Sequence, residues 1–232
     1  MAVGRSVTSL EEIRDIIIAD VVLITAFSLT RIGGIPGFQG NQGALGQFLY
    51  YLPIAAIGVT LSFILHELMH KFLAMRYGAA AEFRTSLSGL AVTIVTGAFG
   101  FLLGIPGATY IYTNSFTDKE NGLVSIAGPL TNLAVFVVFL GIALVFSPPT
   151  NSFLYSVTSF TIFISILLAF FNMLPIYPLD GSKVLHWSKP IYAVSMLAIF
   201  ALMVLFTGIG IFDIIIFVVV ALVFSLFYRF VL

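Results

Sequence analysis

The chain contains no cysteine among its 232 residues, which excludes disulfide bonds and thiolate ligands for a metal ion. Charged side chains are also scarce, at 9% of the sequence, and ten lysines and arginines balance ten aspartates and glutamates. Nucleic-acid binding needs a basic surface, so this even balance argues against a nucleic-acid partner. Only three histidines are present, and two of them lie close together in the sequence.

Apolar residues are abundant instead, at 60% of the chain. They form long runs near residues 15–30, 49–70, 86–105, 123–147, 153–174, 190–208 and 211–231. A helix needs about 20 mostly apolar residues to cross a bilayer, and these runs approach or exceed that length. We therefore predict an all-α polytopic membrane protein, a single membrane-embedded domain over residues 1–232 that is surrounded by lipid.

The stretch FILHELMHKF, residues 63–72, places two histidines and a glutamate in an apolar setting. The motif His66-Glu67-Leu68-Met69-His70 is HExxH, which on a helix puts both histidines on one face, where they can bind one zinc ion. Glu67 lies beside that face and can act as a general base toward a water molecule that zinc activates. A hydrogen-bonded His/Glu cluster between helices is the alternative, but a charge in mid-bilayer costs about 2.5–3.5 kcal/mol. The motif therefore favours metal binding and catalysis.

A hydrolytic zinc site keeps three protein ligands and an open position, so the HExxH helix lacks one ligand. The extended motif HExxHxxGxxH is excluded, because Leu73 and Arg76 stand where it needs glycine and histidine. Three other residues are candidates for the third ligand: His186, Glu82 and Asp180.

Asp180 has an informative sequence context, the stretch NMLPIYPLDG. Pro175 and Pro178 are expected to end the preceding helix, and Gly181 permits a tight turn. Irregular backbone is tolerated at membrane depth only where it is buried in protein or lines a wet cavity. A carboxylate on such a segment is well placed to reach a buried metal.

The motifs together resemble the site-2 protease family of intramembrane zinc metalloproteases. They are the HExxH motif, AGPLTNL at residues 127–133 and FNMLPIYPLDG at residues 171–181. The resemblance implies that Asp180 is the third zinc ligand, that Asn172 holds substrate near the metal, and that a Gly128-Pro129 helix borders the site. It also implies one zinc ion per chain and transmembrane proteins as substrates. It covers a catalytic core of about residues 50–185, and leaves peripheral helices at 15–30, 190–208 and 211–231.

The charges predict a topology. Lys71 and Arg76 follow HExxH, so the positive-inside rule places this end of the helix, and the zinc site, near the cytosol. Asp180 reaches the same depth only if one of the three intervening runs does not cross the membrane. The run at 86–104 contains four glycines and four Ser/Thr residues, so we predict a re-entrant hairpin or partly buried strands there. Six spanning helices then remain, with both termini and the active-site side in the cytoplasm.

Two short segments beside this run have strand-like composition, AAEFRT at residues 80–85 and GATYIYT at residues 107–113. Peptide bonds within a helix are shielded, so a transmembrane substrate must unwind before hydrolysis. An exposed strand edge could hold the unwound chain through main-chain hydrogen bonds. A small sheet that only plugs the bundle is the alternative.

These observations lead to one main functional hypothesis, an intramembrane zinc endopeptidase that carries out regulated proteolysis of membrane proteins. Two alternatives remain. One is a membrane zinc peptidase of another HExxH class, with a glutamate as third ligand. The other is a non-catalytic protein that binds or transports metal and does not need Glu67 as a base.

Overall fold

A computed structural model of the protein describes residues 8–39, 41–102, 106–113 and 115–208, with scattered positions between 210 and 226. The helices are α1 (Leu10–Arg31), α2 (Ala44–Val59), α3 (Leu65–Arg76), α4 (Leu87–Ala98), α5 (Asp118–Phe146), α6 (Phe153–Asn172), α7 (Asp180–Trp187) and α8 (Lys189–Thr207). The strands are β1 (Ala80–Thr85) and β2 (Gly107–Tyr112). The predicted mostly helical fold is confirmed, together with the small β region predicted between the zinc-motif helix and the Gly-Pro helix.

A single long helix carries the HExxH motif. The π-helical turn η2 (Thr60–Ile64) joins α2 to α3, and together they form 33 continuous helical residues, Ala44–Arg76. This helix, α5, α6 and α8 are each long and apolar enough to cross a membrane. The predicted count of six spans is not confirmed, because α1 is not among these helices and the run 211–231 lies almost wholly outside the described residues.

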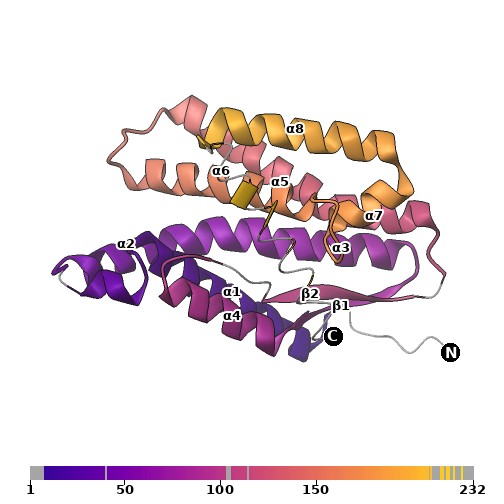
Figure 1. Cartoon of the computed structure of the whole chain (residues 1–232), viewed down its shortest axis with the longest axis horizontal. Coiled ribbons are helices and arrows are strands. Elements are labelled where there is room, and N and C mark those ends of the chain that lie inside the picture. The colour runs from indigo at the N-terminus through magenta and orange to yellow at the C-terminus, as the bar shows by residue number, and fades with distance from the viewer. Residues whose placement is uncertain are drawn as a thin grey trace.

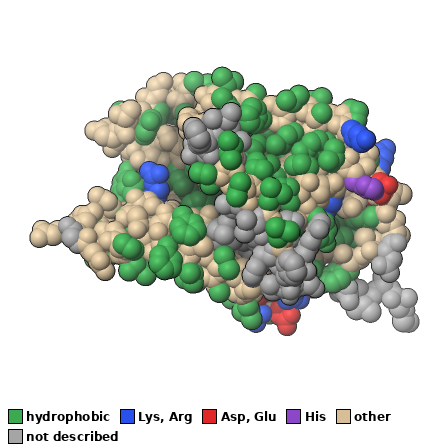
Figure 2. Space-filling view, in the orientation of Figure 1, with side chains coloured by type: hydrophobic (Ala, Val, Ile, Leu, Met, Phe, Trp, Pro, Cys, Tyr) green, Lys and Arg blue, Asp and Glu red, His purple; other side chains and the backbone are tan. Residues whose placement is uncertain are grey.

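The elements form two layers on either side of the long helix (Figure 1). Helices α1 and α4 and the sheet lie on one side, while α5, α6, α7 and α8 lie on the other. The larger core belongs to the second layer and includes Phe136, Ile166, Phe170, Met173, Val184, Ile199 and Met203. Figure 2 shows hydrophobic side chains across the middle of one face and charged side chains near its periphery, as expected for a molecule surrounded by lipid.

The sheet confirms the two strands predicted from composition. They pair antiparallel, with Phe83 of β1 opposite Thr109 of β2. Because the strands are neighbours, the chain leaves the sheet after residue 85 and returns to it by residue 107 at the same end. Helix α4 lies between them, and its 12 residues span about 18 Å, well short of a bilayer. Over its described residues, the run at 86–104 therefore forms a short helix between the two strands, in place of the partly buried strands that were one alternative of the prediction.

Two carboxylates of α1 cover the outer edge of β1. Glu12 accepts a hydrogen bond from the Phe83 amide at 3.0 Å, and Asp15 accepts one from the Thr85 amide at 3.2 Å. Glu12 also forms an ion pair with Lys71, whose Nζ lies 2.6 Å from Oε2, and both residues are buried. The sequence shows Lys71 only as a charge near the cytosol, whereas in the structure it forms part of a packed contact between α1 and α3.

Candidate metal centre

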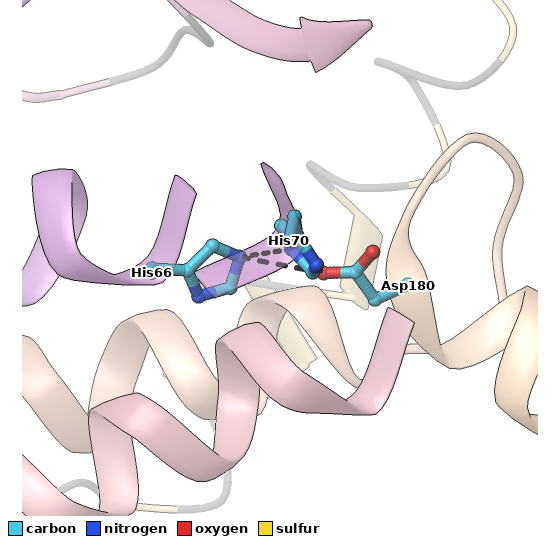
Figure 3. Close-up of side chains that lie close together, drawn as sticks. All are labelled: His66, His70 and Asp180. Atoms are coloured by element: carbon cyan, nitrogen blue, oxygen red, sulfur yellow. Dashed lines mark hydrogen bonds and ion pairs between the residues drawn. The ribbon is translucent and has the colours of Figure 1, made fainter. Parts of the chain in front are cut away.

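Three buried side chains converge between α3 and α7 (Figure 3). His66 and His70 lie one turn apart on α3, and their Nε2 atoms are 3.0 Å from each other. Asp180 is the first residue of α7, and its Oδ2 lies 3.3 Å from Nε2 of His66 and 3.1 Å from Nε2 of His70. Within the described part of the chain, this is the one group of His, Asp and Glu side chains with metal-ligand spacing.

The Nδ1 atoms of both histidines already have hydrogen-bond partners. Nδ1 of His70 lies 2.8 Å from the Val124 carbonyl, which can only accept, so Nδ1 carries the proton. Nδ1 of His66 contacts Oδ1 of Asn132, whose Nδ2 donates to the Ser62 carbonyl at 2.9 Å. Asn132 therefore presents its oxygen to His66. In the neutral imidazoles both Nε2 lone pairs then face Asp180, as metal ligands require.

This donor set fits a zinc ion. Two lone pairs and a carboxylate that meet at one point repel one another unless a cation lies between them. Zinc with Zn–N distances of about 2.0–2.1 Å places tetrahedral ligand atoms roughly 3.3 Å apart, close to the separations of 3.0, 3.1 and 3.3 Å found here. Two histidines and a carboxylate are also a usual ligand set for catalytic zinc.

The charge of Asp180 suits this role. Its burial opposes ionisation, but when the histidines carry protons on Nε2, attraction to His70 and hydrogen bonds from both rings hold the pKa of its carboxyl below the ordinary range. The carboxylate is therefore ionised at neutral pH and able to bind a cation. A proton on Nε2 and a metal ion supply the same positive charge at this point, so they compete for it.

Gly128 and Gly181 leave space around the three candidate metal ligands, His66, His70 and Asp180. A Cβ atom at Gly128 of α5 would lie 2.5 Å from Nε2 of both His66 and His70, so any side chain there would fill the metal position. A Cβ atom at Gly181 would lie 2.1 Å from the Met173 carbonyl oxygen, so glycine lets α7 begin against the end of α6. Gly181 thus lies in the first turn of α7, where it allows α7 to approach the end of α6 closely, and it does not form the tight turn predicted from the Asp-Gly pair.

Glu67 is half-buried on α3 and is held by the sheet. Its Oε2 accepts hydrogen bonds from the Thr109 amide and the Thr109 hydroxyl, both at 2.8 Å. Within the described residues its Oε1 has no hydrogen-bond partner. One carboxylate oxygen is therefore fixed and the other is free to accept a proton.

The remaining candidates from the sequence lie apart from the metal group. His186 is exposed and pairs with Asp118 at 3.6 Å, and Glu82 forms an ion pair with Arg84 at 2.8 Å. Asn172, predicted to hold substrate, is the last residue of α6, and its Nδ2 donates to the Leu168 carbonyl at 3.0 Å. The structure brings together His66, His70 and Asp180, and no contact ties Asn172 to them.

Two residues of the site were not found from the sequence, Asn132 and Thr109. Asn132 lies in the AGPLTNL stretch, four residues after Gly128 and so on the same helix face, and this spacing was a usable indication. Thr109 lies on a strand far from Glu67 in sequence, and no local pattern links the two.

Replacing Asn132 with alanine should weaken zinc binding by about 10–100-fold, because His66 loses the partner that orients its ring. Competition with a coloured chelator in detergent measures the change. Asn121→Ala, on the same helix, is the matched control and should bind zinc like the wild type. Equal affinities in both variants would show that Asn132 does not support the metal.

Comparison with known proteins shows the family of this chain. The model of peptidase family M50 matches residues 149–205, a segment that includes Asp180. The "Putative zinc metalloprotease MJ0611" of Methanocaldococcus jannaschii is 46% identical over 61% of this chain and 73% of its own length. The chain belongs to peptidase family M50, the site-2 protease family.

Other M50 relatives carry similar names. The "Putative zinc metalloprotease Rip2" of Mycolicibacterium smegmatis is 34% identical over 53% of this chain and 52% of its own length, so the match spans about half of that relative. The "Putative zinc metalloprotease YwhC" of Bacillus subtilis is 30% identical over 61% of this chain and 74% of its own length. No solved structure matches the chain significantly. Family membership and the apolar helices identify this M50 chain as a membrane zinc protease.

Proposed function

We propose that the protein is an intramembrane endopeptidase that hydrolyses peptide bonds in or near transmembrane segments of other membrane proteins. The observation that carries this proposal is the position of the HExxH histidines on a 33-residue apolar helix, where they converge with a buried aspartate. Regulated proteolysis of membrane proteins is the corresponding role in the cell. The whole of residues 1–232 acts as one membrane-embedded domain, with its catalytic core at about residues 50–185.

Each residue of the site has a distinct role. His66, His70 and Asp180 would hold the zinc ion. Bound zinc supplies Lewis acidity, which lowers the pKa of a water molecule and polarises the scissile carbonyl. Glu67 accepts the proton of the attacking water at its free Oε1 and then delivers it to the nitrogen of the leaving amine.

Substrate binding uses the sheet and Asn172 in this proposal. The outer edge of β1 is occupied by Glu12 and Asp15 of α1, so β2 is the strand whose edge can receive another chain. An unwound segment of substrate pairs with β2 through its main chain, and Thr109 on β2 already contacts Glu67. Asn172 would release its bond to the Leu168 carbonyl and bind the substrate main chain.

The proposed topology has six spanning helices, with both termini and the zinc site on the cytoplasmic side. Four apolar helices support part of that count. Residues 85 and 107 are paired at the same end of the sheet, which supports a metal site whose ligands lie before and after the run at 86–104. Arg76, Lys183 and Lys189 are charges that favour this orientation.

The purified protein, reconstituted in liposomes with a panel of single-span membrane proteins, tests the proposal. We expect cleavage of at least one panel member within its apolar segment, with the cut position read by mass spectrometry. The Glu67→Gln protein in the same liposomes is the control and should leave the panel intact. Cuts confined to the water-exposed parts of the panel, or no cleavage at all by the wild type, would contradict an intramembrane endopeptidase.

A further inference from the structure

The contact between Thr109 and Glu67 has two donors for one acceptor atom. The amide and the hydroxyl of Thr109 both lie 2.8 Å from Oε2 of Glu67, and the hydroxyl also lies 3.0 Å from the Glu67 carbonyl oxygen. Thr109 is half-buried and lies on β2, 42 residues from Glu67 in sequence. Either donor alone would fix the carboxylate in the resting enzyme.

The amide of Thr109 is also a main-chain group on the side of β2 that faces away from β1. Phe83 and Thr109 are opposite residues in the sheet, and the Phe83 amide points away from β2 to Glu12. In an antiparallel pair of this kind both amides point outward, so the Thr109 amide points away from β1. It is therefore one of the donors that a chain added to β2 would use.

We propose that Thr109 is a positioning residue for Glu67, and that its hydroxyl keeps the base in place when substrate takes the Thr109 amide. This inference rests on the proposed function, in which Glu67 is the base and β2 receives substrate. An unwound substrate that pairs with β2 offers a carbonyl to the Thr109 amide, and Glu67 then loses one of its two donors. The hydroxyl belongs to the side chain, takes no part in strand pairing and remains on Oε2.

The side chain of Thr109 matters most in the substrate complex for this reason. In the resting enzyme a valine at this position would still donate its amide to Glu67, so the fold and the metal ligands are unaffected. In the complex the amide of residue 109 donates to the substrate, and a valine side chain has no donor that could hold the carboxylate of Glu67. A base displaced by about 1 Å can lose roughly a hundredfold in rate.

Enzyme kinetics test the inference. The Thr109→Val and Thr109→Ser variants are compared with the wild type on the single-span protein that the wild type cleaves in liposomes. Thr109→Val should lower kcat by about 10–100-fold, with zinc content unchanged and KM altered less than about threefold. Thr109→Ser keeps the hydroxyl and should retain most of the wild-type kcat. Thr85→Val, a half-buried threonine on β1 whose amide bonds to Asp15, is the matched control and should behave like the wild type.

Amide hydrogen exchange gives a readout that does not depend on activity. The Thr109 amide should exchange about fivefold faster in Glu67→Ala than in the wild type, because it loses its acceptor. An unchanged exchange rate of the Thr109 amide in Glu67→Ala would overturn the contact between Thr109 and Glu67.

Three kinetic outcomes would each overturn the positioning role: a wild-type kcat in Thr109→Val, equal losses of kcat in the valine and serine variants, or loss of zinc in Thr109→Val. The proposed function fails if Glu67→Gln cleaves like the wild type, or if the wild type cleaves nothing. In either case the exchange rate of the Thr109 amide still shows whether Thr109 donates to Glu67.

Discussion

Replacing Glu67 with glutamine should reduce peptide hydrolysis by about a thousandfold while the protein keeps its zinc. Glutamine has the shape of glutamate and can still accept the two hydrogen bonds from Thr109 through its carbonyl oxygen, so the side chain stays in place. It cannot take a proton from water, and general base catalysis contributes about 10²–10⁴-fold in rate. Initial rates on a cleaved single-span substrate, with zinc measured on the same samples, give both quantities.

Glu120→Gln is the matched control for this substitution. Glu120 closes the capping box at the start of α5, and glutamine performs the same capping function, so activity should be unchanged. Hydrolysis that survives in Glu67→Gln would mean that Glu67 is not the base. Zinc flux across liposomes that is equal in the wild type and in Glu67→Gln, with no hydrolysis in either, would favour a transport protein.

Asp180→Ala should reduce the zinc content from about one ion per chain to near none. Two histidines alone leave the ion without a third protein ligand and without the negative charge that offsets its own. The apolar surroundings of this site make that uncompensated charge costly. Zinc is measured by mass spectrometry on detergent-purified protein after dialysis against a weak chelator.

Asp118→Ala provides the comparison, because Asp118 is an exposed aspartate at the start of α5 whose partner is His186. It should retain zinc like the wild type. Zinc retained by Asp180→Ala would instead place the third ligand elsewhere and support another HExxH class. Glu82 would then have to leave its ion pair with Arg84.

The sequence predicted those parts of the site that depend on local geometry. Residues four apart on a helix must share a face, so the pairing of His66 with His70 followed directly from HExxH. The strands at 80–85 and 107–113 were also found, because their composition differs from the helices around them. Asp180 was one of three candidates on composition alone, and only the family resemblance singled it out.

The parts that escaped prediction depend on contacts between distant segments. The sequence showed Lys71 only as a charge near the cytosol, because its partner Glu12 lies on another helix, 59 residues away in the chain. Thr109 and Asn132 are ordinary residues in sequence and gain their roles only when β2 and α5 pack against α3. The hairpin at 86–104 contains a helix because α1 offers a face for it, which composition does not reveal.

Glu12 limits how the molecule can open. One buried carboxylate binds the ammonium of Lys71 on α3 and the amide of Phe83 on β1. Pulling α1 away from the zinc-motif helix would leave an ammonium ion alone in an apolar interior, at a cost of about 3–5 kcal/mol. Glu12 therefore fastens the N-terminal helix to both the sheet and the zinc-motif helix. A protein substrate that arrives from the surrounding lipid is therefore not expected to enter between α1 and the zinc-motif helix.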